Sequence, residues 1–497
     1  MKWIGKSVTV LVCMLFLLTL AVYSQSTAMA AKVEKKAKME KALSGTVAEK
    51  VPKPKAEFDA SKMADMSDYD PANPVIPTGD TIKIALVASF SGPAAIVGQL
   101  YWISAQWAVH DINKRGGLWV DGKKKLIELI KADHMSKPDQ CKKICERMVL
   151  QEKVHVLMGT NGTPNMKVMM EVGNKYKVIV SNFDALSDEL MDATQFNRYT
   201  FMSGYGSQTI ANSHAYYYGQ IRKKEKKFYV ICQDYSYGHS IGEGFKAGLK
   251  KYYPEAQIVG EDYHKLFQTD YASYLTKIKA SGAEVIYTAD WTPDLDNLIK
   301  QARQMGIKIP FANRLLDDPT MLIAIGVEDS KNLVNMSEAE YISPQFRTEN
   351  QIKYHDTWHK LWQTKWKESP YNSKKLAYPD GQRNTVQMQV YWLLSVIERA
   401  KSMDPEKIIK VWEGDSYRTL SGKVLKMRAC DHKVIQDLVI NEFVPPDQQK
   451  VSYNKPPYYW SQEYSYTGYQ HVIPAAKVLP WMDQNLDRCK GKNDWGE

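Results

Sequence analysis

Short apolar runs alternate with stretches of helical periodicity along most of the chain. The clearest case begins at residues 82–87, a run rich in Ile, Leu and Val that is typical of a buried strand. It stops at the small-residue segment 89–93, and a helical pattern follows, with apolar side chains at Leu100, Ile103, Trp107, Val109 and Ile112. This pattern predicts a strand followed by a helix. In the loop between such elements, backbone N–H groups at the start of the helix can bind an anionic group.

The same alternation recurs along the chain. The predicted strands after the first unit are 126–132, 154–158, 178–180, 200–202, 227–232, 257–261, 284–288 and 309–312. The helices predicted between them are 138–152, 165–175, 209–221, 240–253, 271–281 and one that ends at 305. Alternating strands and helices predict parallel sheets with helices on both faces, and two successive sets predict two similar lobes.

The first 30 residues have the parts of a secretory signal peptide. Lys2 and Lys6 precede an apolar run at 8–23, and Ala28 and Ala30 form the A-x-A pattern of a cleavage site. We expect cleavage after Ala30, with an uncleaved membrane anchor as the alternative. No later segment is apolar over the roughly 18 residues that a membrane span needs. We therefore expect a soluble, periplasmic protein.

The length and composition of the chain indicate how many lobes it can form and which classes of partner it can bind. The chain has 497 residues, 44% hydrophobic and 25% charged, which is enough for two lobes with cores of their own. The formal net charge is +10, but no long Lys/Arg run marks a nucleic-acid surface, so we expect no nucleic-acid partner. Residues 31–80 are basic and broken by prolines, and we interpret them as a linker or partial helix, not as a domain.

Cysteines are sparse. Cys141 and Cys145 lie four residues apart on a predicted helix, where a disulfide has poor geometry and two thiols alone make a weak metal site. Cys430 and Cys489 are candidates for a disulfide that ties the C-terminal tail to the body in an oxidising compartment. We expect no metal and no cofactor.

Several segments together carry a family resemblance. In chain order they are IKIALVASFSGPAAIVGQ, AVHDINKRGG, VHVLMGTNGT, FYVICQDYSYGHSIGEGFKAGLK, VIYTADWTPDLDNLIKQARQMGIKIPF and GKVLKMRACDH. Their order and spacing resemble the leucine/isoleucine/valine-type receptors, which are type I periplasmic binding proteins of ABC importers. The resemblance runs from residue 82 to about residue 440.

The resemblance implies an α/β fold of two lobes, each a doubly wound parallel sheet flanked by helices. Three crossovers join the lobes, which close on a ligand like a flytrap. Mapped onto this chain, lobe one is 82–203 plus 333–434. Lobe two is 204–332 plus 435–497 and includes a long tail rich in Tyr and Trp.

A ligand cleft in such a fold lies where the C-terminal ends of parallel strands face each other, so the loops at those ends supply the candidate ligand-binding residues. In lobe one these are Ser91, Asn161, Gly162, Thr163, Phe183, Asp184 and Ala185. In similar receptors the loops at 160–163 and 182–185 bind a ligand carboxylate, and Thr163 and the amides around Ala185 match that role. Asp184 departs from the resemblance, which implies a small neutral residue at this position. An acid there either repels a carboxylate or accepts hydrogen bonds from an amine or amide.

Lobe two adds aromatic and charged candidates. They are Tyr205, Tyr235, Tyr237, Asp290, Trp291 and Arg314. Tyr237 is the tyrosine of a D-x-x-Y-G motif, and Trp291 stands where the resemblance implies a ring over the ligand. The amino-acid receptors place a Glu near position 315 for the ligand ammonium, whereas this chain has Leu315 beside Arg314. Arg314 favours a carboxylate or another anion if it faces the cleft, and is a surface charge if it faces solvent.

These observations predict an extracytoplasmic solute-binding protein that delivers a small amino-acid-like or carboxylate ligand to the membrane permease of an ABC importer. Amides are a further ligand class, and we expect a monomer. The alternative is a ligand-sensing periplasmic receptor that works with a separate signalling protein. No G-x-S-x-G, H-E-x-x-H or P-loop motif is present, and the histidines are scattered, so we expect no enzyme.

Overall fold

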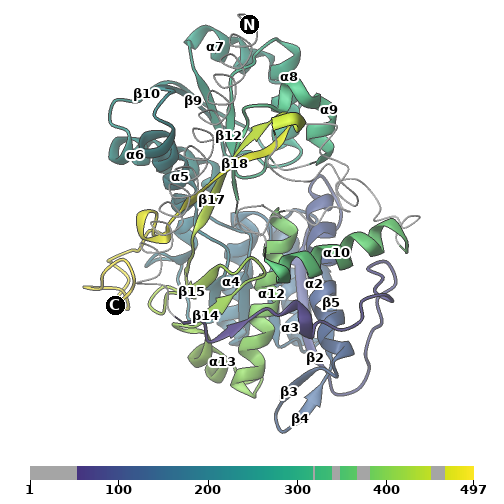
Figure 1. The fold of residues 1–497 in the computed structure, drawn as a ribbon. Coiled ribbons are helices and arrows are strands. Elements are labelled where there is room, and N and C mark those ends of the chain that lie inside the picture. Colours follow the sequence, from purple (N-terminus) through teal and green to yellow (C-terminus); the bar gives the residue numbers. More distant parts are fainter. Residues whose placement is uncertain (1–52, 317–318, 338–347, 366–380, 449–464) are drawn as a thin grey trace, which may run out of the picture. The chain divides into compact units, whose positions relative to one another are not determined.

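The computed structural model describes residues 53–316, 319–337, 348–365, 381–448 and 465–497 (Figure 1). The expected signal peptide, and residues 31–52 of the expected linker, lie outside the described residues. By their contacts, residues 54–497 form one unit. Within the described residues, no helix is both long enough and apolar enough to cross a membrane.

Lobe one is built on a five-stranded parallel sheet with the strand order β5-β2-β6-β7-β8. Its strands are β2 (Ile82–Ala88), β5 (Ile127–Asp133), β6 (Val156–Gly159), β7 (Ile179–Asn182) and β8 (Thr200–Met202). The helices between them are α2 (Ala95–Lys114), α3 (Pro138–Leu150) and α4 (Thr163–Tyr176). Nearly every side chain of β2 is buried, as expected of a central parallel strand that is covered on both faces.

The later part of the chain completes lobe one. A small sheet with the order β1-β14-β15-β16 combines β1 (Ala56–Glu57), β14 (Ser416–Arg418), β15 (Val424–Met427) and β16 (Val434–Ile435). The helices of this part are α10 (Glu349–Gln363), α12 (Gly381–Ala400) and α13 (Pro405–Trp412). Helix α12 packs against α2, and a hairpin of β3 (Leu118–Val120) and β4 (Lys123–Lys125) lies beside α12.

Lobe two is built on a seven-stranded sheet with the order β10-β9-β11-β12-β13-β17-β18. Five of its strands are parallel, namely β9 (Lys227–Gln233), β10 (Gln257–His264), β11 (Val285–Thr288), β12 (Phe311–Asn313) and β13 (Val334–Ser337). β17 (Leu438–Val444) and β18 (Tyr466–Ile473) extend this sheet in antiparallel fashion. The parallel strands repeat the order of lobe one, so both lobes have a topological switch point beside their first strand.

Helices cover both faces of the lobe-two sheet. α5 (Ser207–Tyr216) and α6 (Ser236–Tyr252) contribute to the main core of the molecule. α7 (Ala272–Ser281), α8 (Asp294–Gln304) and α9 (Pro319–Ser330) form a second core on the other face. We expected one helix over 209–221, but α5 continues as a π-helical turn, η3 (Tyr217–Arg222). The remaining short helical turns are η1 (Ala60–Lys62), η2 (Asp188–Met191), η4 (Pro446–Gln448) and η6 (Ala475–Lys477).

Residues 54–80 differ from the expected linker because part of this segment is core. Strand β1 pairs with β14, and the buried Phe58 ring contacts Tyr354 and Tyr391. Tyr69 is also buried and donates a hydrogen bond to the carbonyl oxygen of Ile103 at 2.7 Å. A few well-spaced apolar side chains are enough here, because a preformed lobe supplies the surface on which they pack.

The expected return of the chain to lobe one at residue 333 occurs later in the structure. Residues 334–337 form β13 between β12 and β17, so they belong to the lobe-two sheet and not to lobe one. The chain passes between the two lobes after β8, after β13 and between β16 and β17. These passages are the three crossovers of the fold.

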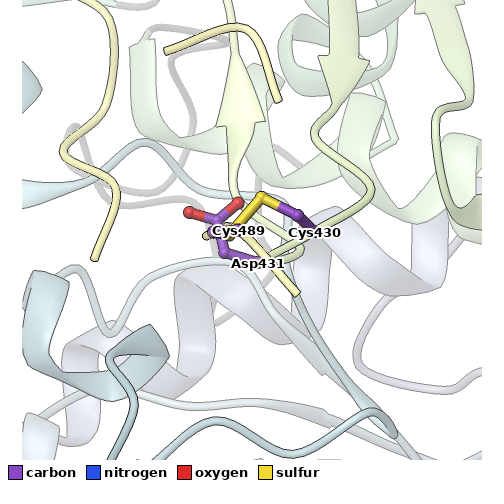
Figure 2. A group of neighbouring side chains, drawn as sticks. All are labelled: Cys430, Asp431 and Cys489. Atoms are coloured by element: carbon purple, nitrogen blue, oxygen red, sulfur yellow. A yellow bond between two sulfur atoms is a disulfide. The ribbon is translucent and has the colours of Figure 1, made fainter. Parts of the chain in front are cut away.

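The C-terminal tail returns to lobe one, although we assigned all of 435–497 to lobe two. Cys430 and Cys489 form a disulfide bond (Figure 2). Met482 and Leu486 pack beside it. The fully buried Arg428 donates to the carbonyl oxygens of three tail residues, Pro480, Trp481 and Asp494, at 2.6–3.0 Å. The tail therefore supplies three carbonyl acceptors to a buried cation of lobe one, which also pairs with Asp431.

Candidate functional site

Arg314 lies at the centre of a buried polar cluster between loops of the two lobes. It follows β12, and the side chain of Asn313 holds its loop by bonding the Asp290 carbonyl at 2.9 Å and the Leu315 amide at 2.7 Å. Only 9% of Arg314 is exposed. Its guanidinium therefore faces the protein interior, which answers the question of orientation that the sequence left open.

Each guanidinium nitrogen of Arg314 has a partner. Nε donates to the Tyr237 hydroxyl at 3.1 Å, Nη1 to the Tyr205 hydroxyl at 2.8 Å, and Nη2 to Asp184 Oδ1 at 2.9 Å. Tyr237 lies at the start of α6 in lobe two, whereas Asp184 follows β7 in lobe one. The ion pair therefore joins the two lobes, over 130 residues of sequence separation.

The lobe-one loop is shaped to present Asp184. Asn182 closes the turn, because its Nδ2 donates to the Ala185 carbonyl at 2.8 Å and its Oδ1 accepts from the Ala185 amide at 3.0 Å. Asp184 Oδ2 accepts a hydrogen bond from the hydroxyl of Tyr101, and the Tyr101 ring meets Phe183 edge-on at 4.8 Å. The Ala185 amide that we expected to bind a ligand carboxylate thus serves the turn itself.

The tyrosines act as neutral hydrogen-bonding groups. Burial raises the pKa of Tyr101 well above its usual value, and the adjacent Asp184 carboxylate raises it further. Burial also raises the pKa of Tyr237, against the opposing effect of Arg314. Both hydroxyls keep their protons at any physiological pH. Arg314 and Asp184 are therefore the charged members of the hydrogen bonds described here.

A second aromatic group adjoins this cluster in lobe two. Trp291 Nε1 donates to the Tyr235 hydroxyl at 3.0 Å, and Phe267 meets the indole edge-on at 5.8 Å. The Tyr235 ring lies 6.0 Å from that of Tyr237. These contacts place Trp291 and Tyr235, two of the predicted residues, in one aromatic surface next to Arg314.

Two glycines let the helices approach the strands that carry these loops. A Cβ on Gly238, in the first turn of α6, would lie 1.9 Å from the carbonyl oxygen of Gln233. A Cβ on Gly98 of α2 would lie 2.1 Å from the carbonyl oxygen of Ser89. Each helix start is therefore packed against the end of its lobe's first strand, which brings Tyr237 and Tyr101 to the site.

The other lobe-one candidates form contacts within their own lobe. Asn161 Oδ1 accepts from the Ser89 amide at 3.3 Å, and Gly162, with φ 84°, caps α4. Thr163 is buried, and within the described residues its hydroxyl has no hydrogen-bond partner. Ser91 is exposed and donates to Asp133 at 2.6 Å. No described hydrogen bond connects these four residues to Arg314.

Asp290 supports the loop before Trp291. It is fully buried, and its Oδ2 bonds His264 Nε2 at 2.8 Å, while His264 Nδ1 faces the Lys265 carbonyl at 2.9 Å. The pKa of His264 is raised, since the hydrogen bond and charge of Asp290 outweigh the opposing effect of burial. Asp290 thus links the loop after β11 to the end of β10, which is not the neighbour of β11 in the sheet.

Sequence reasoning missed Tyr101 and Phe267. Tyr101 lies on the buried face of α2, and an apolar-periodicity pattern treats such a residue as core. A hydroxyl on that face is the one sequence signal that points to a polar partner. Phe267 has a positive φ of 61° in the loop after β10, where the sequence carries no comparable sign.

Another group of side chains has the sulfur and carboxylate atoms that can bind a metal ion. Within the described residues, Cys430, Asp431 and Cys489 are the only such group close enough to share an ion. Both sulfurs are joined in the disulfide (Figure 2). Asp431 accepts two hydrogen bonds from Arg428, at 2.8 and 2.6 Å. A disulfide offers no thiolate, so this group does not fit a metal.

Comparison with known proteins identifies the family. Residues 81–448 match the model of a family described as periplasmic binding protein. The chain belongs to the periplasmic binding protein family. This family binds solutes outside the cytoplasm, and the two-lobed fold agrees with it.

The most similar relatives of this periplasmic binding protein include two with named ligands. An amino acid binding protein of Pseudomonas aeruginosa is 27% identical over 235 residues, which are 46% of this chain and 59% of that protein. The Leu/Ile/Val-binding protein of Escherichia coli is 22% identical over 232 residues, 47% of this chain and 60% of the relative. The aligned part thus spans about three-fifths of these relatives.

Solved structures share the fold over a longer span. A periplasmic binding protein of Burkholderia mallei has a TM-score of 0.67 at 21% identity, covering 83% of this chain and 99% of its own. A solute binding protein of an ABC transporter from Rhodopseudomonas palustris, in complex with 4-hydroxybenzoate, has a TM-score of 0.63 at 18% identity, covering 82% and 100%. At these identities the likeness establishes the fold.

Proposed function

We propose that this protein is the extracytoplasmic solute-binding component of an ABC importer, acting without catalysis, and that it captures a small amino-acid-like or carboxylate ligand between its lobes. The buried Arg314–Asp184 pair carries this proposal, because its two charges come from opposite lobes and sit among aromatic side chains. Burying a charge is costly unless it is paired and hydrogen-bonded, as both of these charges are.

The mechanism follows from the two-lobed arrangement. The ligand enters the open cleft, and the lobes rotate about the three crossovers until groups from both lobes contact it. Only a ligand that interacts better with the closed form shifts this equilibrium, so residues of both lobes determine affinity. The closed, monomeric protein then docks on a membrane permease, where a cytoplasmic subunit hydrolyses ATP.

The ligand classes rest on chemistry and on the relatives. Arg314 offers paired N–H donors for a carboxylate, and Asp184 offers an acceptor for an ammonium. Tyr235, Tyr237 and Trp291 add rigid apolar area with few rotamers to immobilise. The relatives named for amino acids, and the structural neighbour that holds 4-hydroxybenzoate, support both ligand types.

The test is a thermal-shift screen of the secreted protein, followed by calorimetry. The panel contains branched and aromatic amino acids, amides, urea, and aliphatic and aromatic carboxylates. A ligand at 100 times its dissociation constant adds about 2.7 kcal/mol of stability, which gives a clear shift. Arg314→Gln is expected to abolish the shift, whereas Arg198→Gln, which removes an exposed arginine paired with Glu406, is expected to keep it. If no compound of the panel raises the melting temperature, the proposal is contradicted.

A further inference from the structure

We propose that Asp294 is a positioning residue for the aromatic surface of Trp291 and Tyr235, and that this surface binds a ligand tightly only while the Asp294 carboxylate is ionised. The inference deepens the proposed function, on which it rests, by adding a regulation of the same site. Its basis is the place of one buried carboxylate oxygen, which joins three loops at the carboxyl ends of lobe-two strands.

The first contact of this oxygen reaches the loop after β10. Asp294 is the first residue of α8, three residues after Trp291, and its side chain is fully buried. Its Oδ2 accepts a hydrogen bond from the Phe267 amide at 2.8 Å. The Phe267 ring in turn meets the Trp291 indole edge-on at 5.8 Å. Asp294 therefore holds the backbone of the residue whose ring packs on Trp291.

The second contact of the same oxygen reaches the end of β9. Gln233, the last residue of that strand, donates from Nε2 to Asp294 Oδ2 at 2.8 Å. The Gln233 carbonyl accepts from the Tyr235 amide at 2.9 Å, and the Tyr235 hydroxyl accepts from Trp291 Nε1 at 3.0 Å. Two closed circuits of contacts thus start at Asp294, and both pass through Trp291.

The charge of Asp294 determines how firmly these circuits hold. Within the described residues Asp294 forms no ion pair, whereas the neighbouring Asp290 pairs with His264 at 2.8 Å. The hydrogen bonds of Asp294 come from two uncharged N–H donors, and such bonds are roughly twice as strong to an ionised acceptor as to a neutral one. Protonation of Asp294 therefore weakens the common anchor of the loops after β9 and β10.

The titratable groups around Asp294 leave it as the one that changes charge near pH 6. They are Asp290 after β11, His264 at the end of β10 and Tyr271 before α7. Burial, with the charge of Asp290, raises the pKa of Asp294 to about 6. Against burial, the hydrogen bond and charge of Asp290 raise the pKa of His264, so His264 is already protonated there. Burial raises the pKa of Tyr271, which stays neutral.

The first experiment follows Trp291 in the secreted protein without any ligand. The protein is labelled with 5-fluorotryptophan, and the Trp291 resonance in the ¹⁹F NMR spectrum is assigned by its loss in Trp291→Phe. In wild type this resonance is expected to shift with a midpoint at about pH 6. This titration needs no variant of Asp294, so it stands even if a substitution there impairs folding.

Asp294→Asn is expected to remove the shift, because the amide oxygen accepts both N–H bonds at every pH. Asp270→Asn is the matched control. It neutralises an exposed acid of the same loop after β10, whose carboxylate accepts from the Ala272 amide at 2.9 Å. The control is expected to keep the wild-type titration of the Trp291 resonance.

Phe267→Ala separates positioning from a direct effect of the charge on the indole. The variant keeps the backbone N–H that bonds Asp294 but loses the ring that meets Trp291. We expect the pH-dependent shift of the Trp291 resonance to fall to less than about half of its wild-type size. An undiminished shift in Phe267→Ala would mean that the charge acts on the indole directly, which overturns the positioning role.

The second experiment measures binding by calorimetry at pH 7.5 and pH 5, with phenylalanine, leucine and benzoate as probes. With a midpoint at about pH 6, about one-tenth of the Asp294 side chains are ionised at pH 5. The affinity of wild type for a probe that it binds is therefore expected to fall about tenfold more than the affinity of Asp294→Asn. Titration of the probe itself cancels in this comparison.

The results distinguish this inference from the proposed function. A Trp291 resonance that does not move between pH 4.5 and pH 8, or that moves equally in Asp294→Asn, overturns the positioning role. A probe whose affinity falls equally in wild type and Asp294→Asn overturns the regulation and leaves solute binding intact. If neither the probes nor the wider panel bind, the proposed function fails, and the NMR titration still decides whether Asp294 positions the aromatic surface.

Discussion

At the residue scale, the site depends on a few side chains whose surroundings set their charge and contacts. Burial keeps water from competing for the hydrogen bonds of Arg314 and Asp184, and each of the two has defined partners. Trp291 and Asp294 stand close to one another in sequence but differ in kind. Trp291 lies in the aromatic surface beside Arg314, whereas Asp294 is a fully buried acid at the start of α8.

Trp291→Ala is expected to weaken ligand binding by about 2 kcal/mol, because the indole supplies rigid apolar area in the site. Calorimetry with the ligand from the screen measures the change. Trp119→Ala, which truncates a 48% exposed tryptophan on the β3–β4 hairpin, is the control and should leave affinity unchanged. Equal affinity of Trp291→Ala and wild type would remove Trp291 from the site.

Asp294→Asn is expected to change the pH dependence of stability. Burial, with the nearby Asp290, raises the pKa of Asp294 to about 6, against the hydrogen bonds from Gln233 and the Phe267 amide. The folded state therefore binds this proton more tightly than the unfolded chain. The resulting stability is full below the unfolded value of 3.8 and is lost as pH rises through about 6.

Asp294→Asn removes the titrating carboxyl, so the variant does not lose this stability as pH rises. Its stability relative to wild type should rise by about 3 kcal/mol between pH 3.5 and pH 7.5, which corresponds to about two pKa units. Urea unfolding of both proteins at several pH values measures this difference, and other titrating groups cancel in the comparison. Parallel pH profiles for the two proteins would contradict a raised pKa at Asp294.

At the element scale, the structure explains why the loops converge. Both lobes repeat one strand order, and in each the helix after the first strand starts against that strand's end. Most expected strands and helices are present within a few residues of their expected bounds. The exceptions occur where packing between distant parts of the chain determines the secondary structure. One is β1, which pairs with a strand about 360 residues away in sequence.

Gly238→Ala tests the close approach of α6 to β9. A methyl group would lie 1.9 Å from a backbone carbonyl oxygen, so the helix must shift. We expect a net loss of about 1–3 kcal/mol of stability in urea unfolding, although alanine favours helix formation by about 1 kcal/mol. Ligand affinity should fall too, because Tyr237 moves with the helix. A more stable variant would contradict the packing.

At the scale of the whole molecule, the tail adds a fourth passage between the lobes. After β18 in lobe two, the chain returns to lobe one, where the disulfide, Arg428 and the small core around Met482 and Leu486 hold it. Asp483 also accepts from the Ala193 amide, at 2.9 Å, and Arg488 bonds Glu413. The tail is therefore part of the folded body of lobe one.

Replacing both Cys430 and Cys489 by alanine is expected to lower the free energy of unfolding by about 2–5 kcal/mol, because the bond closes a loop of 59 residues in the unfolded chain. Urea unfolding with and without reductant measures the loss. Reductant should weaken wild type and leave the double variant unchanged, since Cys141, Cys145 and Cys232 are free thiols. An equal response of both proteins would contradict the structural role of the bond.

The sequence by itself determined the local elements and the family. Periodicity marks each strand and helix because neighbouring residues share one face, and the loop positions of Tyr237, Trp291 and Arg314 follow from strand ends. Tertiary structure alone decided that Arg314 turns inward to Asp184, that Tyr101 joins them, and that the tail packs on lobe one. These contacts join residues far apart in the chain, and local periodicity carries no information about which distant surfaces meet.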